Sequence, residues 1–219
     1  GCDKIYYCNG SSDCNPTKIY TGPIQISNEG TTYIRFYSTD NVGNKENIKS
    51  VTVKIDKSLP ETTAQGKKAD GTDYKFGEWT NQNVTVTLTC VDYLSGCNKT
   101  YYCTDDNNAC TPDILYDTYH PQIQISEEGT TYVRFYSIDK AGNKEDTKSE
   151  IVRIDRSPPN TTAQGTKADG TPYKFGEWTN QSVNVTLNCS DSGSGCDKIY
   201  YCNGSSDCNP TKIYTGPIQ

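Results

Sequence analysis

The amino-acid sequence predicts an all-β protein built from tandem β-sandwich domains that are stapled by local disulfides. Three observations predict this fold class: segments in which apolar residues alternate with period two, motifs that recur at a fixed interval, and 11 cysteines among 219 residues. No segment shows the sustained 3.6-residue period of an amphipathic helix.

Internal repeats set the size of one domain. The motif Thr62–Gly66 returns as Thr161–Gly165, and Gly77–Asn81 returns as Gly176–Asn180, in both cases 99 positions later. One module is therefore roughly 95 to 100 residues long, which is the size of a small β-sandwich.

A second period, of 194 positions, lies over the first, because Cys2–Gln25 is identical to Cys196–Gln219. Two slightly different modules alternate, and the longer one carries extra residues between Cys110 and Ser126. The repeats predict the C-terminal part of one domain over 1–58, a complete domain over 59–157, and the N-terminal part of the next over 158–219.

The predicted boundaries are short and rich in proline. Pro60 ends one strand-like segment, and Pro158 with Pro159 ends the corresponding segment of the next module. Proline breaks a β-ladder and stiffens the chain. We therefore expect modules that are joined end to end with restricted bending.

The complete module contains several segments with strand character. In Asn83–Cys90 and Thr131–Ser137, apolar and polar residues alternate, which predicts one buried face for each segment. The turn residues Asp139–Asn143 join the second segment to Glu150–Ile154 in a predicted hairpin. Further strands are expected over 99–103 and 121–126. The residues predicted to face the core are Val84, Val86, Leu88, Cys90, Val133 and Phe135.

These residues resemble a known family, the bacterial Ig-like repeats of surface adhesins and envelope proteins. The resemblance lies in Val84–Leu88, Asp92, Ser95–Gly96, a Tyr-Tyr strand, Ile123–Thr130 and Asp139–Asn143. It covers the complete module and both partial ones, and it implies an Ig-like sandwich used as a stalk, spacer or adhesive repeat without catalytic residues. The sequence departs from the family at Cys90 and Cys97, where small or apolar residues are usual.

Four cysteines of the complete module allow three pairings. Cys97 and Cys103 lie on one predicted strand, about 20 Å apart if extended, so they cannot bond to each other. Of the two pairings that remain, we favour Cys90 with Cys97 and Cys103 with Cys110. The loop between the second pair changes length from module to module but keeps a cysteine at each end, as a local cross-link would.

The same pattern extends to the partial modules. The equivalent cysteines are Cys189, Cys196, Cys202 and Cys208 near the C-terminus, and Cys8 and Cys14 near the N-terminus. Cys2 has no mate, because its counterpart would lie upstream of Gly1. A zinc site is the alternative, but structural zinc sites favour cysteines two to four residues apart, and no such pair occurs in the sequence.

Composition limits the cellular location and the classes of partner that this protein can have. The net charge of -6 and the pI near 4.9 argue against nucleic acid or an anionic membrane as the main partner. No segment approaches the ~18 to 20 apolar residues that a membrane span needs. Abundant cysteine predicts an oxidising, extracellular location, either secreted or at the cell surface.

Other candidate sites each have a plain structural interpretation. His120 is the only histidine, so a catalytic triad or a multi-histidine metal site within one chain is excluded, and we expect a loop residue. Calcium at the domain joints is a possibility, but turn capping is the favoured role of the aspartates in question, Asp40, Asp92, Asp139 and Asp191. We expect no cofactor.

Aromatic residues offer two further candidates. Trp79 and Trp178, beside Phe76 and Phe175, suit either a carbohydrate platform or the packing of a module end, and we favour packing. A stripe of outward aromatic and arginine residues suits either a contact surface or ordinary cross-strand pairing, and we favour pairing. The stripe consists of Tyr132, Arg134 and Tyr136, with Tyr33, Arg35 and Tyr37.

Asparagine sequons are frequent, and they predict surface glycosylation if the organism has the machinery. They are Asn9, Asn83, Asn98, Asn160, Asn180, Asn184, Asn188 and Asn203.

The sequence favours a non-enzymatic structural repeat of an extracellular filament or adhesin stalk, whose partners are neighbouring copies of itself along a fibre. Near-identical repeats imply that position along the chain matters little. A module that recognises a glycan or a host or cell-surface protein is the alternative. No paired carboxylates, activated nucleophile or phosphate-cradling loop indicates an enzyme.

Overall fold

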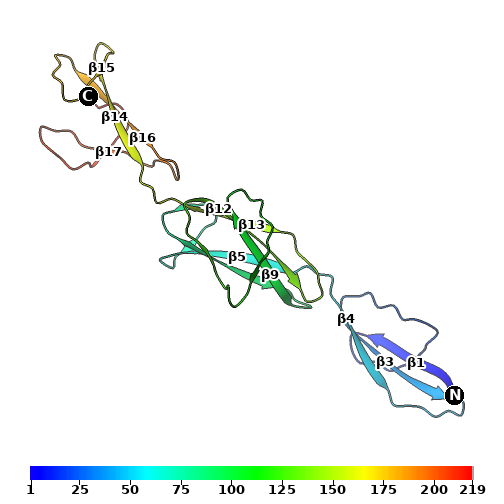
Figure 1. The fold of residues 1–219 in the computed structure, drawn as a ribbon. Coiled ribbons are helices and arrows are strands. Elements are labelled where there is room, and N and C mark those ends of the chain that lie inside the picture. Colours follow the sequence, from blue (N-terminus) through cyan, green and yellow to red (C-terminus); the bar gives the residue numbers. More distant parts are fainter. Residues whose placement is uncertain (219) are drawn as a thin grey trace. The chain divides into compact units, whose positions relative to one another are not determined.

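The computed structural model describes residues 1–218 and contains β-strands and turns, with no helix among them (Figure 1). Within that range, no helix is long and apolar enough to cross a membrane. The fold class predicted from the sequence, Ig-like β-sandwich domains with local disulfides, is confirmed.

The chain divides into two compact units, each of which takes strands from the middle of the sequence. One unit comprises Gly1–Gln65, Val86–Ile123 and Tyr132–Glu150. The other comprises Gly66–Thr85, Gln124–Thr131 and the described residues from Ile151 onward. Because these units differ from the three segments that the repeats predict, the domain boundaries at 58 and 157 stay a prediction.

The N-terminal segment forms one antiparallel sheet. Its strands are β1 (Cys2–Gly10), β2 (Lys18–Ile19), β3 (Gly30–Asp40) and β4 (Lys49–Ile55), in the order β2-β1-β3-β4. In this register Tyr7 lies opposite Phe36, and Ile34 lies opposite Val51. One face of the sheet is consequently apolar.

The middle segment forms two sheets, which are the layers of the sandwich. The first has the order β10-β9-β12-β13-β7. Its strands are β7 (Trp79–Thr80), β9 (Cys97–Asp105), β10 (Ile114–Tyr116), β12 (Gly129–Asp139) and β13 (Lys148–Ile154). The second has the order β11-β8-β5-β6. Its strands are β5 (Glu61–Lys68), β6 (Asp73–Tyr74), β8 (Val84–Val91) and β11 (Ile123–Ile125).

The core of the middle segment matches the predicted alternation. Val84, Val86 and Leu88 of β8 are buried, as are Val133 and Phe135 of β12. Cys90, which was expected on the same face, is only half-buried, because it lies near the end of β8 and bonds to Cys97 at the start of β9.

Several strands were not predicted. β5 is built from threonine, alanine, glutamine and glycine, so it lacks the apolar alternation by which the other strands were recognised. β7 has two residues, and it pairs in parallel with β13 through Arg153 opposite Trp79 and Ile154 opposite Thr80. Pairing of this kind depends on a partner 74 positions away, which no local pattern reveals.

The C-terminal segment repeats the beginning of the middle one. β14 (Asn160–Lys167), β15 (Pro172–Tyr173) and β16 (Val183–Ser190) form a sheet in the order β15-β14-β16. A short hairpin follows, made of β17 (Tyr200–Tyr201) and β18 (Lys212–Ile213).

Candidate functional site

Five disulfides join cysteines that are six or seven residues apart in the sequence. In the middle segment, Cys90 bonds to Cys97 and Cys103 bonds to Cys110. The other pairs are Cys8–Cys14, Cys189–Cys196 and Cys202–Cys208. Cys2 is a free, exposed thiol. Each bond closes a short local loop, so it restrains the unfolded chain without linking distant segments.

An arginine on the neighbouring strand anchors the disulfide loop that follows β9. Arg134 donates a hydrogen bond from Nη1 to the carbonyl oxygen of Cys110 at 2.6 Å. Arg35 makes the same contact with the carbonyl oxygen of Cys14 at 3.0 Å. These arginines belong to the outward stripe noted in the sequence, and here they hold a loop against the sheet.

Two tyrosines of that stripe, Tyr136 and Tyr37, pair across strands. The ring of Tyr136 lies 5.5 Å from that of Tyr101, and the Lys144 ammonium lies 3.8 Å from the centre of the Tyr136 ring. The ring of Tyr37 pairs with Tyr6 and receives a lysine in the same way. Ring and cation contacts of this kind stabilise a solvated sheet face.

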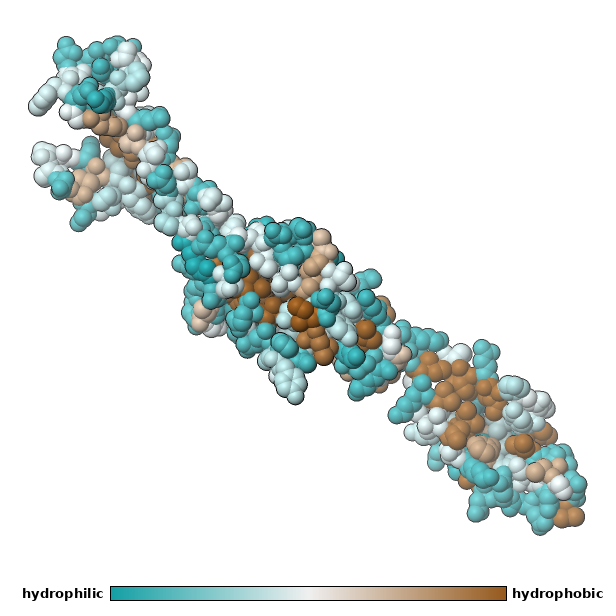
Figure 2. All heavy atoms as spheres, in the orientation of Figure 1, coloured by the Kyte–Doolittle hydropathy of each residue, from teal (hydrophilic) through white to brown (hydrophobic). Residues whose placement is uncertain are grey.

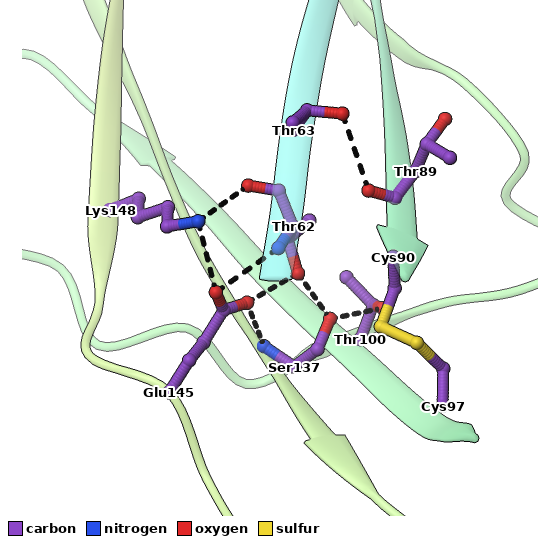
Figure 3. A network of polar contacts seen from close by, with 9 residues as sticks. All are labelled: Thr62, Thr63, Thr89, Cys90, Cys97, Thr100, Ser137, Glu145 and Lys148. Carbon is purple, nitrogen blue, oxygen red and sulfur yellow. Dashed lines mark hydrogen bonds and ion pairs between the residues drawn. A yellow bond between two sulfur atoms is a disulfide. The ribbon is translucent and has the colours of Figure 1, made fainter. Parts of the chain in front are cut away.

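A buried glutamate organises the polar contacts inside the middle segment (Figure 3). Glu145 is 5% exposed and lies in the connection between β12 and β13. Its carboxylate accepts hydrogen bonds from the backbone N–H of Ser137 at 2.7 Å and from the backbone N–H of Thr62 at 3.1 Å. The Thr62 hydroxyl also contacts it, and the Lys148 ammonium lies 3.1 Å away.

Hydroxyl groups extend this network across the strands. The hydroxyl of Ser137 lies 2.5 Å from that of Thr62 and 2.7 Å from that of Thr100 (Figure 3). Lys148 also donates to the carbonyl oxygen of Thr62 at 2.7 Å. A buried carboxylate is costly unless it is paired. These donors therefore make Glu145 a clamp between β5 and β12, and Ser137 links that clamp to Thr100 of β9. We call these five residues the Glu145 network.

The linker after β4 is hydrogen-bonded on both sides. Asp56 accepts from the backbone N–H of Ser95, which lies between β8 and β9, at 2.8 Å. The next residue, Lys57, donates its backbone N–H to Glu29 at 2.7 Å and its ammonium to the carbonyl oxygen of Ser27 at 2.8 Å. Side chains in the linker therefore fix its path.

The linker after β13 repeats this bonding. Asp155 accepts from the backbone N–H of Ser194 at 2.6 Å. Arg156 donates its backbone N–H to Glu128 at 2.9 Å and its Nη1 to the carbonyl oxygen of Ser126 at 3.0 Å. Each contact involves the residue that corresponds by repeat to its counterpart in the first linker.

Three aspartates converge beside the first linker. One carboxylate oxygen from each of Asp56, Asp92 and Asp139 lies within 4.8 Å of the others. Hydrogen bonds from Ser95 hold the pKa of Asp56 below its usual value. Burial opposes ionisation of Asp139, yet hydrogen bonds from Asn143, Gly142 and Ser95 together outweigh burial and leave the pKa of Asp139 lowered.

The donors around these aspartates are the turns themselves. Asn143 gives its backbone N–H and its amide group to Asp139 at 2.8 and 2.7 Å, and Gly96 gives its backbone N–H to Asp92 at 2.5 Å. Calcium takes six to eight oxygen ligands, so three carboxylates offer part of a shell. Turn capping already accounts for where these oxygens lie, and calcium binding stays a prediction.

The two tryptophans differ in their surroundings. Trp79 is 37% exposed, because β7 pairs with β13 and Arg153 approaches the indole ring at 6.0 Å. Trp178, its repeat counterpart, is fully exposed. Both tryptophans are thus exposed, so the packing role and the carbohydrate alternative both stay predictions.

The remaining sequence candidates lie at the surface. His120 is exposed, and its backbone N–H donates to Asp117 at 3.0 Å, in the loop before β11. Of the eight sequon asparagines, Asn9 is half-buried and the other seven are exposed. Glycosylation of these asparagines stays a prediction.

The Glu145 network and Asp56 were missed in the sequence. A signal was present in the repeats. Thr62 opens the repeated Thr62–Gly66 motif, and Asp56 precedes the first boundary as Asp155 precedes the second. Repetition alone does not say which polar residues are buried, so these positions looked like solvent-facing residues.

The comparisons with known proteins do not assign this chain to a family. No family model matches the chain, and no curated protein matches it. A solved structure of the Clostridium thermocellum CbhA fibronectin(III)-like modules aligns at 15% identity over 70% of this chain and 79% of that chain, with a TM-score of 0.27. A likeness this low carries no argument about fold or function.

Proposed function

We propose that this protein is a non-enzymatic structural repeat of a long extracellular filament or adhesin stalk. Its modules are bacterial Ig-like repeats in a cysteine-rich variant, and its partners are neighbouring copies along the fibre. One observation carries the proposal: the bonding of the linker at Asp56–Lys57 recurs at Asp155–Arg156.

Recurrent linker bonding suits a load-bearing repeat. A flexible linker leaves neighbouring modules free to reorient, whereas a linker that is hydrogen-bonded on both sides and followed by proline restricts that freedom. The same contacts at successive junctions favour one repeated geometry, as a stalk requires. Recognition of a ligand does not by itself require it.

The chemistry of the modules agrees with an extracellular location. Five local disulfides persist only where the surroundings are oxidising. Thin cores of few large apolar side chains benefit from such cross-links. We therefore place the protein outside the cell, secreted or at the cell surface.

The linker bonds can be tested in the full chain. Asp56→Asn combined with Asp155→Asn should weaken both linkers, and small-angle scattering at low protein concentration should then show a more flexible chain than the unsubstituted protein. Asp106→Asn, an exposed aspartate away from both linkers, is the matched control. Unchanged scattering in the double variant would contradict the proposal.

Glycan or protein recognition is the alternative function. Saturable binding of the chain on a glycan array, lost on substitution of the exposed Trp178, would support it in place of the stalk.

A further inference from the structure

Two pairs of tyrosine rings lie side by side on the outward faces of this protein's sheets. In the middle segment the ring centres of Tyr101 and Tyr136 lie 5.5 Å apart, with an angle of 34° between the ring planes. In the first segment the ring centres of Tyr6 and Tyr37 lie 5.2 Å apart, and the angle is 19°. Near-parallel stacking is a favoured arrangement of aromatic rings. The same pair therefore recurs in two segments of the chain.

The strand register sets the geometry of each pair. Tyr136 of β12 lies directly opposite Tyr101 of β9, and Tyr37 of β3 lies directly opposite Tyr6 of β1. Residues directly opposite each other in an antiparallel pair keep their Cβ atoms about 4.5 to 5.5 Å apart, and their side chains project from the same face. The two phenol rings of a pair consequently reach the same height above the sheet, where the ring carbons beside their hydroxyl groups can meet.

The rings of the middle pair are accessible from solvent. Hydrophilic residues cover much of the middle segment in the view of Figure 2, and Tyr101 and Tyr136 are half-buried at the surface. The Lys144 ammonium lies 3.8 Å from the centre of the Tyr136 ring, and this cation contact holds the ring in place. A small oxidant can therefore reach two rings whose arrangement is already fixed.

The disulfides leave the strands of this pair without a covalent link to each other. Each disulfide joins cysteines that are six or seven residues apart. Tyr101 and Tyr136, in contrast, bring together β9 and β12, which are separated in the sequence by both β10 and β11. A bond between the two rings closes a much longer loop than any of these disulfides, and a longer closed loop restrains the unfolded chain more strongly.

We propose that Tyr101 and Tyr136 form a site of oxidative cross-linking, at which a peroxide couples the two rings into dityrosine, and that Tyr6 and Tyr37 form the equivalent site of the first segment. The inference rests on the proposed function in placing the protein outside the cell, where oxidants reach it. It adds to each module of the stalk a covalent link between strands that are distant in the sequence.

The coupling step balances in atoms and electrons. Hydrogen peroxide, with a peroxidase as catalyst, takes one electron and one proton from each phenol and is itself reduced to two molecules of water. The two tyrosyl radicals then join through one Cε carbon of each ring, and the hydrogen on each bonded carbon moves to the hydroxyl oxygen of its own ring. The product has lost two hydrogen atoms, and no other side chain is changed.

Two other tyrosine pairs provide matched controls within the chain. Tyr102 with Tyr116, and Tyr7 with Tyr20, meet edge to face, with ring centres 6.2 and 6.3 Å apart. The Tyr116 hydroxyl already donates a hydrogen bond to the carbonyl oxygen of Pro121, and burial raises the pKa of Tyr102. Both conditions oppose removal of the phenolic hydrogen, so we expect these pairs to couple poorly.

The full chain can be tested with hydrogen peroxide and a peroxidase, at low protein concentration and under conditions that couple free tyrosine. After digestion, mass spectrometry should find the peptides of Tyr101 and Tyr136 joined, with the loss of two hydrogen atoms. Their yield should exceed that of joined Tyr102 and Tyr116 by at least about tenfold, because directly opposed rings are held close to the geometry of the coupled product. The reduced and denatured chain should lose this preference.

Variants of the full chain locate the site. Tyr136→Phe should abolish the middle link and leave the Tyr6–Tyr37 link unchanged, because phenylalanine keeps the ring contact but has no hydroxyl group to oxidise. Tyr119→Phe, in an exposed loop, should change neither link. An oxidised chain in which Tyr101 and Tyr136 stay unlinked, or in which the edge-to-face pairs couple equally well, overturns the proposal. The scattering test of the linkers involves no oxidation, so the stalk proposal fails or stands separately.

Discussion

Phe135 and Phe36 occupy the same place in two copies of one repeat, yet only the first is buried. Phe135 is 1% exposed inside the complete middle sandwich, whereas Phe36 is half-buried on the open first sheet. Both strands pair correctly with their neighbours, and both segments keep their disulfide loops. Strand pairing and local cross-links therefore form with one layer, while a core needs two.

The polar residues show the same contrast. Glu46 keeps the contacts that lie within its own sheet, the backbone N–H of Ser38 at 2.8 Å and the Lys49 ammonium at 2.7 Å. It lacks the threonine that Glu145 receives from β5. The glutamate is thus positioned by its own hairpin and becomes a clamp between layers when β5 is present.

The largest expected effect comes from the core. Phe135→Ala should lower the free energy of unfolding of the middle segment by about 3 to 5 kcal/mol, because it leaves a cavity between two layers. Phe36→Ala should cost far less, because Phe36 is only half-buried and its removal leaves no enclosed cavity. Denaturant unfolding measures both, and equal losses would erase the contrast between the two segments.

Removal of a disulfide should have the next largest effect on stability. Replacing Cys103 and Cys110 by serine should destabilise the middle segment by roughly 2 to 4 kcal/mol, since the bond no longer restrains the unfolded chain. Cys2→Ser removes a free thiol and serves as the control. A thermal transition that does not move in the double variant would argue against the stabilising role of these local bonds.

The Glu145 network provides a smaller and more specific test. Thr62→Val removes a hydroxyl that contacts both Glu145 and Ser137, and it should cost about 1 to 3 kcal/mol because buried polar groups lose a partner. Thr161→Val alters the exposed counterpart in β14 and should have little effect. If thermal melts show the same loss in both variants, the network does not depend on the second layer.

Acid should affect Asp70 in the middle segment and Asp169 in the C-terminal segment alike, because the contacts that lower the pKa of each lie within its own segment. The Thr72 hydroxyl, with the Gln82 amide, lowers the pKa of Asp70 from 3.8 to about 2, and Thr171 with Gln181 does the same for Asp169. A lowered folded-state pKa contributes stability above pH 3.8 that is lost as the pH falls through about 2. Carboxyl NMR titration should give both aspartates the same low midpoint, and an ordinary value for Asp169 alone would mean that this turn needs a complete module.

The sequence predicts the local features of this fold well. Alternation identifies β8 and β12, and the spacing of Cys90 with Cys97 and of Cys103 with Cys110 points to the bonds that form. These features depend on residues within a few positions of one another.

Long-range features escape such patterns. β7 becomes a strand only because β13 lies beside it, and Asp56 meets Asp92 and Asp139 from separate parts of the chain. Burial of Glu145 likewise depends on β5, whose residues look like a polar loop. Exposure of Phe36 cannot be inferred from its strand, which is nearly the same as the strand of Phe135.

Hydrogen exchange of the full chain, measured at low concentration, tests the need for two layers most directly. The backbone amides of β8 and β12 should exchange slowly, because they open only when the middle sandwich unfolds. Those of β3 and β16 should exchange much faster despite matching sequences. Equal protection of β3 and β12 would show that a single layer is enough, and it would contradict this account.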